Sequence, residues 1–321
     1  MKQFEVIPQK HIEAYVTYCQ ASGRLCDHDL IYLSVFDNYC HNNWPGSNNI
    51  TQEMVDQWSA QRQTEKNNST RSRIYPLIGF LSYLKQRKLT DITLPKIPKY
   101  ERSTYIPHSF SNNELTRFFG ACDSFKIHQH SFRSMNLKAT IPVFFRLLYS
   151  SGIRTTEARL LKTEDVDLKN GILNIRQSKG YDQHHVVLHE TMAIVLRQYD
   201  DYIKKLYPER TYFFPKNKEE GRTRYWVWST FRKIWDSVND SYATPYELRH
   251  HYAIVNINKW VSSGFNFYDK LVYLSKSMGH SSLESTKYYY SLVPALSDIM
   301  KDLSESDFND IIPEVYDEEN K

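Results

Sequence analysis

Two arginines, a lysine, a histidine and a run of tyrosines in the second half of the sequence have side chains suited to phosphoryl transfer. Arg154 lies in the segment SGIRTTEARLL, Lys179 in QSKGYD, Arg249 in TPYELRHHYA and His280 in MGHSS, and tyrosines occupy positions 288–290. Arginine presents planar, paired donors to phosphate oxygens. A tyrosine phenol can attack phosphorus and form a covalent intermediate, and a lysine can protonate a leaving oxygen. The set predicts a covalent phosphoryl transfer that needs no metal, because guanidinium groups supply the positive charge.

The segments around these residues predict the elements that must position them. TIPVFFRLLYSSGIR is typical of an apolar helix that ends at Gly152, and TTEARLL begins another helix directly after Arg154. DVDLKNGILNIRQ reads as two strands joined by a turn at Asn170-Gly171, and HHVVLH as a third strand. Lys179 lies in the loop SKGYDQ between the second and third strands. We therefore expect a mostly α (α+β) protein with one small antiparallel three-stranded sheet.

The first hundred residues predict a separate helical domain. In STRSRIYPLIGFLSYLKQRK, apolar residues recur at the spacing of one helix face, and Ser69 or Thr70 is the expected N-cap. Pro76 is unfavourable inside a helix, so we expect a kink or a later start there.

A proline-containing segment, TLPKIPKYERSTYIPHS, predicts an extended linker over residues 93–109. The next helix is expected to begin in SNNELTRFF, with Ser111 as N-cap and Glu114 completing a capping box. The boundary therefore lies near residue 105. We predict a helical core-binding domain with linker over 1–105, a catalytic domain over 106–292 and an acidic tail over 293–321.

Charge is distributed unevenly along the chain. The net charge is +4, but residues 62–102 carry ten Lys and Arg against three acidic residues, and residues 293–321 carry nine acidic residues against two lysines. A basic body with an acidic tail indicates a nucleic-acid partner, although a basic face can also be simply solvated. The candidate phosphate-binding residues of this region are Arg71, Arg73, Lys96, Lys99 and Arg102.

Composition excludes several other classes of protein. The sequence contains no apolar run of the roughly 18 residues that a membrane helix needs, and MKQFEVIPQKHIEAY contains no signal-peptide core. A cytoplasmic protein with reduced cysteines is expected. Cys26, His28, Cys40 and His41 lack the paired spacing of a zinc site, so burial of the cysteines is favoured over metal binding.

The order of these segments resembles that of the tyrosine recombinases, also called the phage integrase family, over about residues 109–292. The family pattern G-[LI]-R-x-x-E-x-x-x-L is matched by GIRTTEARLL, which contains Arg154 and Glu157. The hairpin lysine of the family is matched by Lys179. The family places its nucleophilic tyrosine nine residues after the histidine of a Gly-His pair, and the same count from His280 gives Tyr289, in preference to its two neighbours. The helix STRSRIYPLIGFLSYL resembles the core-binding helix of the family more weakly.

The resemblance implies a site-specific DNA recombinase or integrase without a cofactor. The chain resembles the simpler two-domain recombinases, such as transposon integrases or resolvases of chromosome dimers, and departures such as Tyr246 favour a mobile element. Tyr289 would attack a DNA phosphodiester, form a 3′-phosphotyrosyl link and release a 5′-hydroxyl. Arg154 and Arg249 would bind the non-bridging oxygens, Lys179 would protonate the leaving oxygen, and His280 would donate a hydrogen bond. The implied partners are double-stranded DNA and three further copies of the chain, in a homotetramer on two DNA sites.

One position departs from the family pattern [HK]-x-L-R-H, because this chain reads YELRH with Tyr246 first. A phenol is protonated near neutral pH, so we expect Tyr246 to donate a hydrogen bond rather than act as a base. Glu157 is expected to orient a catalytic residue. His250 and His251, beside Arg249, are expected to pack and form hydrogen bonds rather than bind a metal, and His184 and His185 are expected to belong to the hairpin.

Two alternatives to the recombinase stay open from the sequence. A type IB topoisomerase-like enzyme uses similar residues but rejoins the same strand. A catalytically decayed DNA-binding protein would keep the fold without the reaction, although the joint presence of Arg154, Lys179, Arg249, His280 and Tyr289 argues against it.

Overall fold

The structure is a computed structural model that describes residues 3–24, 27–101, 107–126, 131–176, 183–261 and 267–279. The chain folds into two compact units, residues 1–105 and 106–321, and each unit is described here by itself. None of the helices in the described ranges is both long enough and apolar enough to cross a lipid bilayer. The predicted site residues that lie outside the described residues are Arg102, Lys179, His280 and Tyr289, together with the acidic tail.

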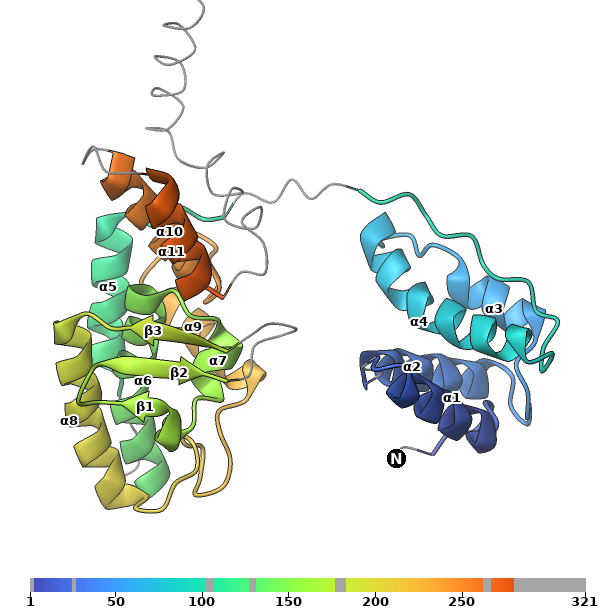
Figure 1. The fold of residues 1–321 in the computed structure, drawn as a ribbon, viewed down its shortest axis with the longest axis horizontal. Helices are drawn as coiled ribbons and strands as arrows, with labels where there is room; N and C mark the ends of the chain where they lie inside the picture. Colours follow the sequence, from blue (N-terminus) through green and yellow to red (C-terminus); the bar gives the residue numbers. More distant parts are fainter. Residues whose placement is uncertain are drawn as a thin grey trace, which may run out of the picture. The chain divides into compact units, whose positions relative to one another are not determined.

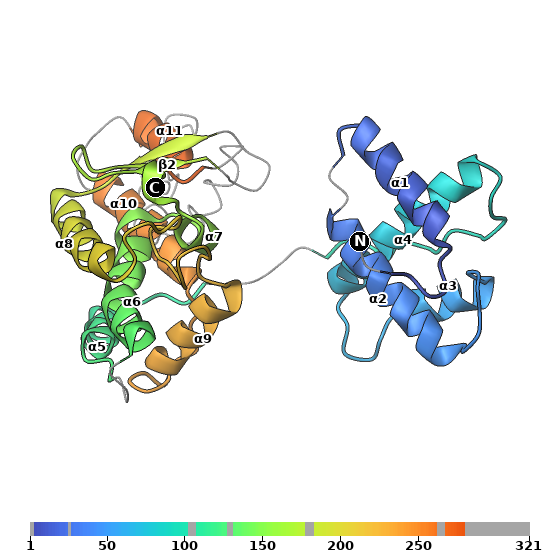
Figure 2. The same ribbon diagram turned by 90° about the horizontal axis from the view of Figure 1, so that it is seen from below.

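Unit 1 is a small bundle of helices around its own core (Figures 1 and 2). Its aromatic centre combines Tyr15, Phe36, Trp58 and Phe80, and the Tyr15 and Phe80 rings meet edge to face at 5.3 Å. The helices are α1 (Gln9–Ala21), α2 (Asp27–Asn43), α3 (Gln52–Ser59) and α4 (Asn67–Gln86).

Helix α4 begins earlier than the sequence predicts. Its N-cap is Lys66 rather than Ser69 or Thr70, and Thr70 is fully buried inside the first turns. Pro76 lies within the helix, and its ring is buried. Burial of the ring against the core offsets the one backbone hydrogen bond that a proline removes, so α4 continues through it.

Asp37 of α2 fixes the start of the chain on unit 1. Its carboxylate is buried and accepts hydrogen bonds from the backbone N–H groups of Glu5, Val6 and Ile7 at 2.7, 2.9 and 2.7 Å. Three donors from consecutive residues satisfy a carboxylate that would otherwise be costly to bury.

Unit 2 packs a small antiparallel sheet against helices (Figures 1 and 2). The sheet has the order β1-β2-β3, as predicted. The strands are β1 (Val166–Asp167), β2 (Ile172–Ile175) and β3 (His184–Val187), preceded by a short 3₁₀ turn, η1 (Thr163–Asp165). The helices are α5 (Asn112–Asp123), α6 (Phe132–Ser151), α7 (Thr155–Arg159), α8 (Glu190–Leu206), α9 (Arg224–Trp235), α10 (Glu247–Val261) and α11 (Phe267–Ser277).

The predicted hairpin turn at Asn170-Gly171 is confirmed. Gly171 has φ of +66°, a left-handed conformation that favours glycine, and Asp167 accepts hydrogen bonds from the backbone N–H of Asn170. Along β2, Leu173 and Ile175 are buried and alternate with more exposed neighbours, so one face of the sheet packs on the helices.

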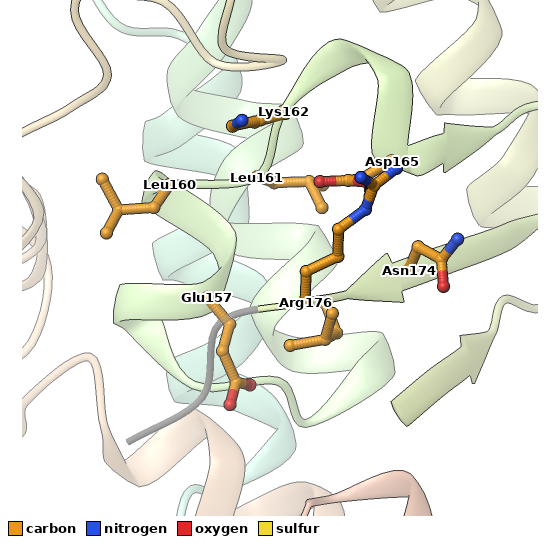
Figure 3. A pocket seen from close by; sticks show the side chains of 8 residues that line it. Glu157, Leu160, Leu161, Lys162, Asp165, Asn174 and Arg176 are labelled. Atoms are coloured by element: carbon orange, nitrogen blue, oxygen red, sulfur yellow. Dashed lines mark ion pairs between the residues drawn. The ribbon is translucent and has the colours of Figure 1, made fainter. Parts of the chain in front are cut away.

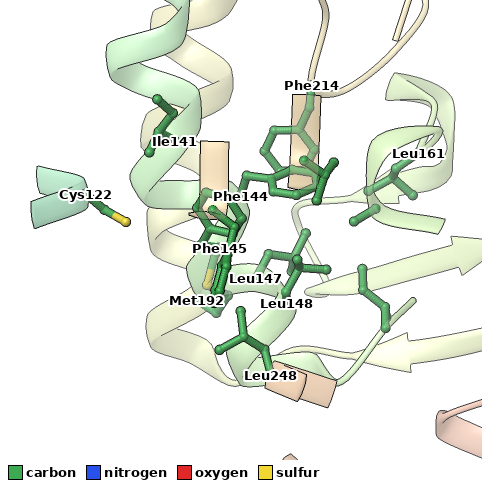
Figure 4. Packing of buried hydrophobic residues seen from close by; sticks show 14 of the residues in the cluster. Cys122, Ile141, Phe144, Phe145, Leu147, Leu148, Leu161, Met192, Phe214 and Leu248 are labelled. Atoms are coloured by element: carbon green, nitrogen blue, oxygen red, sulfur yellow. The ribbon is translucent and has the colours of Figure 1, made fainter. Parts of the chain in front are cut away.

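Helix α6 runs through the centre of the unit 2 core (Figure 4). Phe144 and Phe145 are fully buried on α6, and the ring centroids of Phe145 and Phe231 of α9 lie 5.7 Å apart. The predicted capping box at the start of α5 is confirmed, since Ser111 Oγ accepts from the Glu114 N–H and the Glu114 carboxylate accepts from the Ser111 N–H. These contacts hold α5, α6 and α9 as a rigid support for the turn that follows α6.

Candidate active site

Arg154 is the N-cap residue of α7, directly after the end of α6. The Glu157 carboxylate accepts from the Arg154 backbone N–H at 2.8 Å and from its guanidinium Nη1 at 2.6 Å. The Glu157 side chain is 1% exposed and that of Arg154 is 19% exposed. A buried carboxylate held in this way fixes the guanidinium in one orientation, which matches the orienting role expected for Glu157.

Arg249 lies in the first turn of α10 and is 2% exposed. Its Nη1 donates to the carbonyl oxygen of Gly152 and its Nη2 to that of Met278, both at 2.6 Å. The Arg154 Nη2 donates to the carbonyl oxygen of the next residue, Gly279, also at 2.6 Å. The two arginines, 95 positions apart in the sequence, therefore converge on the turn that ends α11.

Gly152 makes this convergence possible in two ways. It ends α6 with φ of +65°, and a Cβ atom there would lie 2.3 Å from the Tyr252 ring of α10. The position therefore requires glycine for its backbone conformation and for the close approach of α10.

Gly279 has the same two constraints at the end of α11. Its φ is +60°, and a Cβ atom would lie 2.5 Å from the imidazole of His184 on β3. Helix α11 thus ends against the sheet, with His280 as the next residue. His184 serves the hairpin and its packing, as expected.

Tyr246 immediately precedes α10 and is 45% exposed. Its ring packs edge-on against His250, with ring centroids 5.0 Å apart, while the Arg249 guanidinium is directed to Gly152 and Met278. The ring contact of Tyr246 and the hydrogen bonds of Arg249 therefore lead to different neighbours.

His250 and His251 pack in the interior. Burial lowers the pKa of His250 to about 4 and also lowers the pKa of His251. The His251 ring stacks on the Tyr149 ring, with ring centroids 5.5 Å apart. In the described part of the chain, no group of three or more His, Cys, Asp or Glu residues is arranged to hold a metal ion.

An ion pair anchors the end of β2, where the predicted lysine loop begins. Arg176 pairs with the buried carboxylate of Asp165 (Figure 3). The Arg176 Nη1 also lies 3.7 Å from the Glu164 carboxylate. A small hollow of about 60 Å³ lies between this pair and Glu157. Lys179 follows three residues later, outside the described residues.

The predicted DNA-binding residues of unit 1 fall into two groups. Lys96 and Lys99 are exposed, and Arg71 is half-buried between the Tyr75 and Tyr100 rings. Arg73 requires a correction, because it is buried and its guanidinium pairs with Glu65 at 2.6 Å. The hydrogen bond from Arg73 lowers the pKa of Glu65 to about 2, so this ion pair is part of the fold and Arg73 is not available to a phosphate.

The sequence did not single out Arg159, Arg224 or Trp228, which line one hollow together with Tyr246. A signal was present, because Arg224 opens the basic and aromatic segment RYWVWSTFRK. Such a segment is often a solvated helix face, and only the fold shows that α7 packs beside it.

The curated relatives and solved structures that match this chain include recombinases and integrases. The tyrosine recombinase XerD of Pseudomonas putida is 26% identical over 239 residues, covering 73% of this chain and 74% of the relative. The tyrosine recombinase XerA of Pyrococcus horikoshii is 24% identical over 198 residues, covering 61% of this chain and 59% of the relative. A putative integrase/recombinase of Sinorhizobium fredii, y4rE, is 27% identical over 155 residues, so that 47% of this chain matches half of that relative.

Solved structures share the fold. The Tn1549 transposon integrase, in complex with transposon right-end DNA, has a TM-score of 0.60 at 12% identity, covering 91% of this chain and 98% of that one. The XerH recombinase, in a post-cleavage complex with its difH substrate, has a TM-score of 0.58 at 18% identity, covering 87% of this chain and 78% of that one. The family model described as the phage integrase family matches residues 109–295, more than half of the sequence. The chain therefore belongs to the phage integrase family.

Proposed function

We propose that the protein is a site-specific DNA recombinase that cleaves and rejoins DNA through a 3′-phosphotyrosyl link to Tyr289. The observation that carries the proposal is the convergence of Arg154 and Arg249 on the carbonyl groups of Met278 and Gly279, directly before His280. Two fixed guanidinium groups at one turn are suited to a phosphate that gains negative charge as it is attacked.

In the proposed cleavage, the Tyr289 oxygen forms a bond to phosphorus as the bond from phosphorus to the 5′-oxygen breaks. The phenol gives up its proton to water, and Lys179 protonates the leaving 5′-oxygen. Arg154 and Arg249 bind the non-bridging oxygens, and His280 donates a further hydrogen bond. Each guanidinium has five N–H donors, so contacts to backbone carbonyls and to phosphate are compatible.

Rejoining reverses these steps with a new strand. The 5′-hydroxyl of the partner strand attacks the phosphotyrosyl phosphorus, and the Tyr289 oxygen leaves and regains a proton. Each step exchanges one phosphate ester for another, so the reaction needs no external energy source. Glu157 supports both steps by keeping the Arg154 guanidinium in place.

We further propose that unit 1 binds duplex DNA as the core-binding domain and that four copies assemble on two DNA sites. Exposed Lys96 and Lys99 support the first point, since they lie on the segment after α4. A lambda integrase solved as a tetramer on a Holliday junction, with a TM-score of 0.55 and 17% identity, supports the second. We expect deletion of residues 297–321 to weaken the tetramer, as sedimentation of the DNA complex would show. A mobile-element role and a cytoplasmic location also belong to this proposal.

The decisive experiment is to trap the covalent adduct. The tagged protein is captured from cells under denaturing conditions, and the DNA attached to it is sequenced, which also supplies the cleavage site. A duplex nicked beside that site then traps the adduct in vitro.

Tyr289→Phe should abolish the adduct, whereas Tyr288→Phe and Tyr290→Phe should keep it, because only the attacking oxygen is removed. An adduct with Tyr289→Phe would rule out this nucleophile. Relaxation of a supercoiled plasmid without exchange between two sites would instead identify a topoisomerase-like enzyme.

A further inference from the structure

A hollow of about 290 Å³ lies between α7 and α9, outside the carbonyl turn that Arg154 and Arg249 hold. Two of its lining residues are next to the candidate active site in sequence, since Thr155 follows Arg154 and Tyr246 precedes Arg249 by three positions. The polar and aromatic groups that line it are Thr155, Arg159, Arg224, Trp228, Thr244 and Tyr246.

The hollow brings two arginines together without an acid to balance them. Among the residues that the structure describes, neither Arg159 nor Arg224 forms an ion pair, and the described lining contains no carboxylate. Burial, and then the positive charge of Arg224, lower the pKa of Arg159. The Arg159 Nε is buried and has no hydrogen-bond partner within the described ranges. Two facing cations and an unsatisfied buried donor would be stabilised by an anion between them.

The position of Arg224 at the start of its helix also favours an anion in the hollow. Arg224 is the first residue of α9, and the first turn of α9 contains no acidic residue. A cation there is unfavourable, because the amino end of a helix carries partial positive charge. An anion bound in the hollow would relieve this repulsion as well.

The hollow is also open to a large partner. Trp228 is 47% exposed at its rim, and Tyr225, one residue after Arg224, is 74% exposed. Exposed aromatic rings beside paired arginines suit a nucleic-acid backbone, whose sugars and bases offer apolar surface next to each charge. A free inorganic anion would use the arginines but not the rings.

We propose that the hollow binds a second phosphodiester of the DNA, besides the attacked one, through Arg159, Arg224 and the Tyr246 hydroxyl. The inference rests on the proposed function for the identity of the ligand. Arg159 and Arg224 would hold the backbone beside the cleavage point, so that the attacked phosphate is presented to Arg154 and Arg249. Arg159 and Arg224 are in this sense positioning residues.

The test uses the full chain and a fluorescein-labelled duplex of random sequence, with affinity measured over a series of NaCl concentrations. Each phosphate contact contributes about 0.9 to the slope of log K against log salt. Because Arg159 and Arg224 share one phosphate, replacing both by Gln should reduce the slope by about 0.9, and each single variant should reduce it by part of that amount. The control is Lys204→Gln, which removes the same charge from an exposed position on α8 and should leave the slope unchanged. Arg224 is exposed, so its variant keeps the test valid if Arg159→Gln unfolds.

A second arm separates DNA from free anions. The melting temperature of each protein is compared in sodium phosphate and in sodium chloride of equal ionic strength, because a bound anion stabilises the folded state by mass action. If the phosphate-dependent shift falls in the variants while both salt slopes equal that of the parent, the hollow binds free anions and the DNA assignment is overturned. Unchanged slopes without any phosphate effect overturn it too.

Failure of this inference can be distinguished from failure of the proposed function. The salt slope depends on DNA binding alone, and Tyr289→Phe should keep the parental slope while it loses the adduct. If the parent forms no adduct but Arg224→Gln has a smaller salt slope than the parent, the recombinase proposal fails and the phosphate site stands. If the parent forms the adduct but Arg224→Gln has the parental salt slope, the recombinase proposal stands and the phosphate site fails.

Discussion

The Nη2 of Arg249 donates a hydrogen bond to the carbonyl oxygen of Met278 at 2.6 Å, and this bond ties the first turn of α10 to the end of α11. Arg249 also reaches Gly152, so one buried side chain joins three segments that are far apart in the sequence. The proposed phosphate ligand is therefore also a structural crosslink, and chemistry and stability are coupled at this position.

Arg249→Ala should lower both the rate of adduct formation and the melting temperature. Loss of a charge-stabilising donor slows the reaction by about 10²–10³, and each buried carbonyl that loses its donor costs about 1–3 kcal/mol of unfolding free energy. Single-turnover kinetics and thermal unfolding would measure the two effects. Arg197→Ala is the matched control, because Arg197, on α8, also donates a hydrogen bond to a backbone carbonyl, that of Leu168, at 2.8 Å. The control should lose some stability and keep its cleavage rate; an unchanged rate in Arg249→Ala would remove Arg249 from the site.

Gly152→Ala should destabilise unit 2 by roughly 2–4 kcal/mol, because alanine is strained at this φ and its methyl group would overlap the Tyr252 ring. Urea unfolding followed by circular dichroism would measure the change. Gly120→Ala provides the contrast, since Gly120 lies inside α5 and an added Cβ meets nothing within 4 Å. That variant should gain about 0.5–1 kcal/mol. Equal effects of the two substitutions would contradict the constraint at Gly152.

His250 should make the stability of unit 2 depend on pH below about 6.5. Burial holds the folded-state pKa at about 4, so the unfolded chain binds the proton first as the pH falls. The stabilisation is complete above the pKa of histidine in the unfolded chain, about 6.5. It is lost progressively toward pH 4, by at most about 1.4 kcal/mol of unfolding free energy per pH unit. His250→Gln should flatten the melting temperature over this window, whereas His185→Gln, at an exposed position of β3, should not. Identical pH profiles for parent and His250→Gln would refute this assignment.

Tyr246→Phe should slow cleavage by roughly fivefold, because it removes the hydrogen bond that the Tyr246 hydroxyl would donate to the second phosphodiester, and one neutral hydrogen bond contributes about 1 kcal/mol. Tyr246→His should be tolerated, since an imidazole can make the same bond and can also accept a proton. Rates on the nicked duplex between about pH 6 and 9 would separate the two roles. A Tyr246→Phe rate equal to the parental rate throughout would show that the phenol only packs against His250.

The sequence predicts the elements of this fold well where local chemistry decides them. The end of α6 at Gly152, the Asn170-Gly171 turn and the Ser111 capping box each depend on residues adjacent in the chain. The start of α4 differs from the prediction because its N-cap, Lys66, has no side chain that caps the helix, and Thr70, an expected N-cap, is instead buried within the helix.

Long-range charge pairing is what the sequence does not reveal. Arg73 and Arg71 are equivalent basic residues in the pattern, and it is the position of Glu65 and of the Trp58 and Ala60 carbonyls that makes Arg73 structural. Arg159 and Arg224 are 65 positions apart, and their approach depends on how α7 packs against α9. The spacing of family motifs identified Arg154 and Arg249, but not the carbonyl groups that hold them together.

The carboxylate of Asp37 has a consequence for how unit 1 opens. Because it accepts three successive amide protons from Glu5, Val6 and Ile7, these amides should exchange with solvent deuterium as slowly as those of α2 itself. Residues 5–7 would then belong to the same cooperative folding unit as the helix that carries Asp37, and they would open only together with that helix.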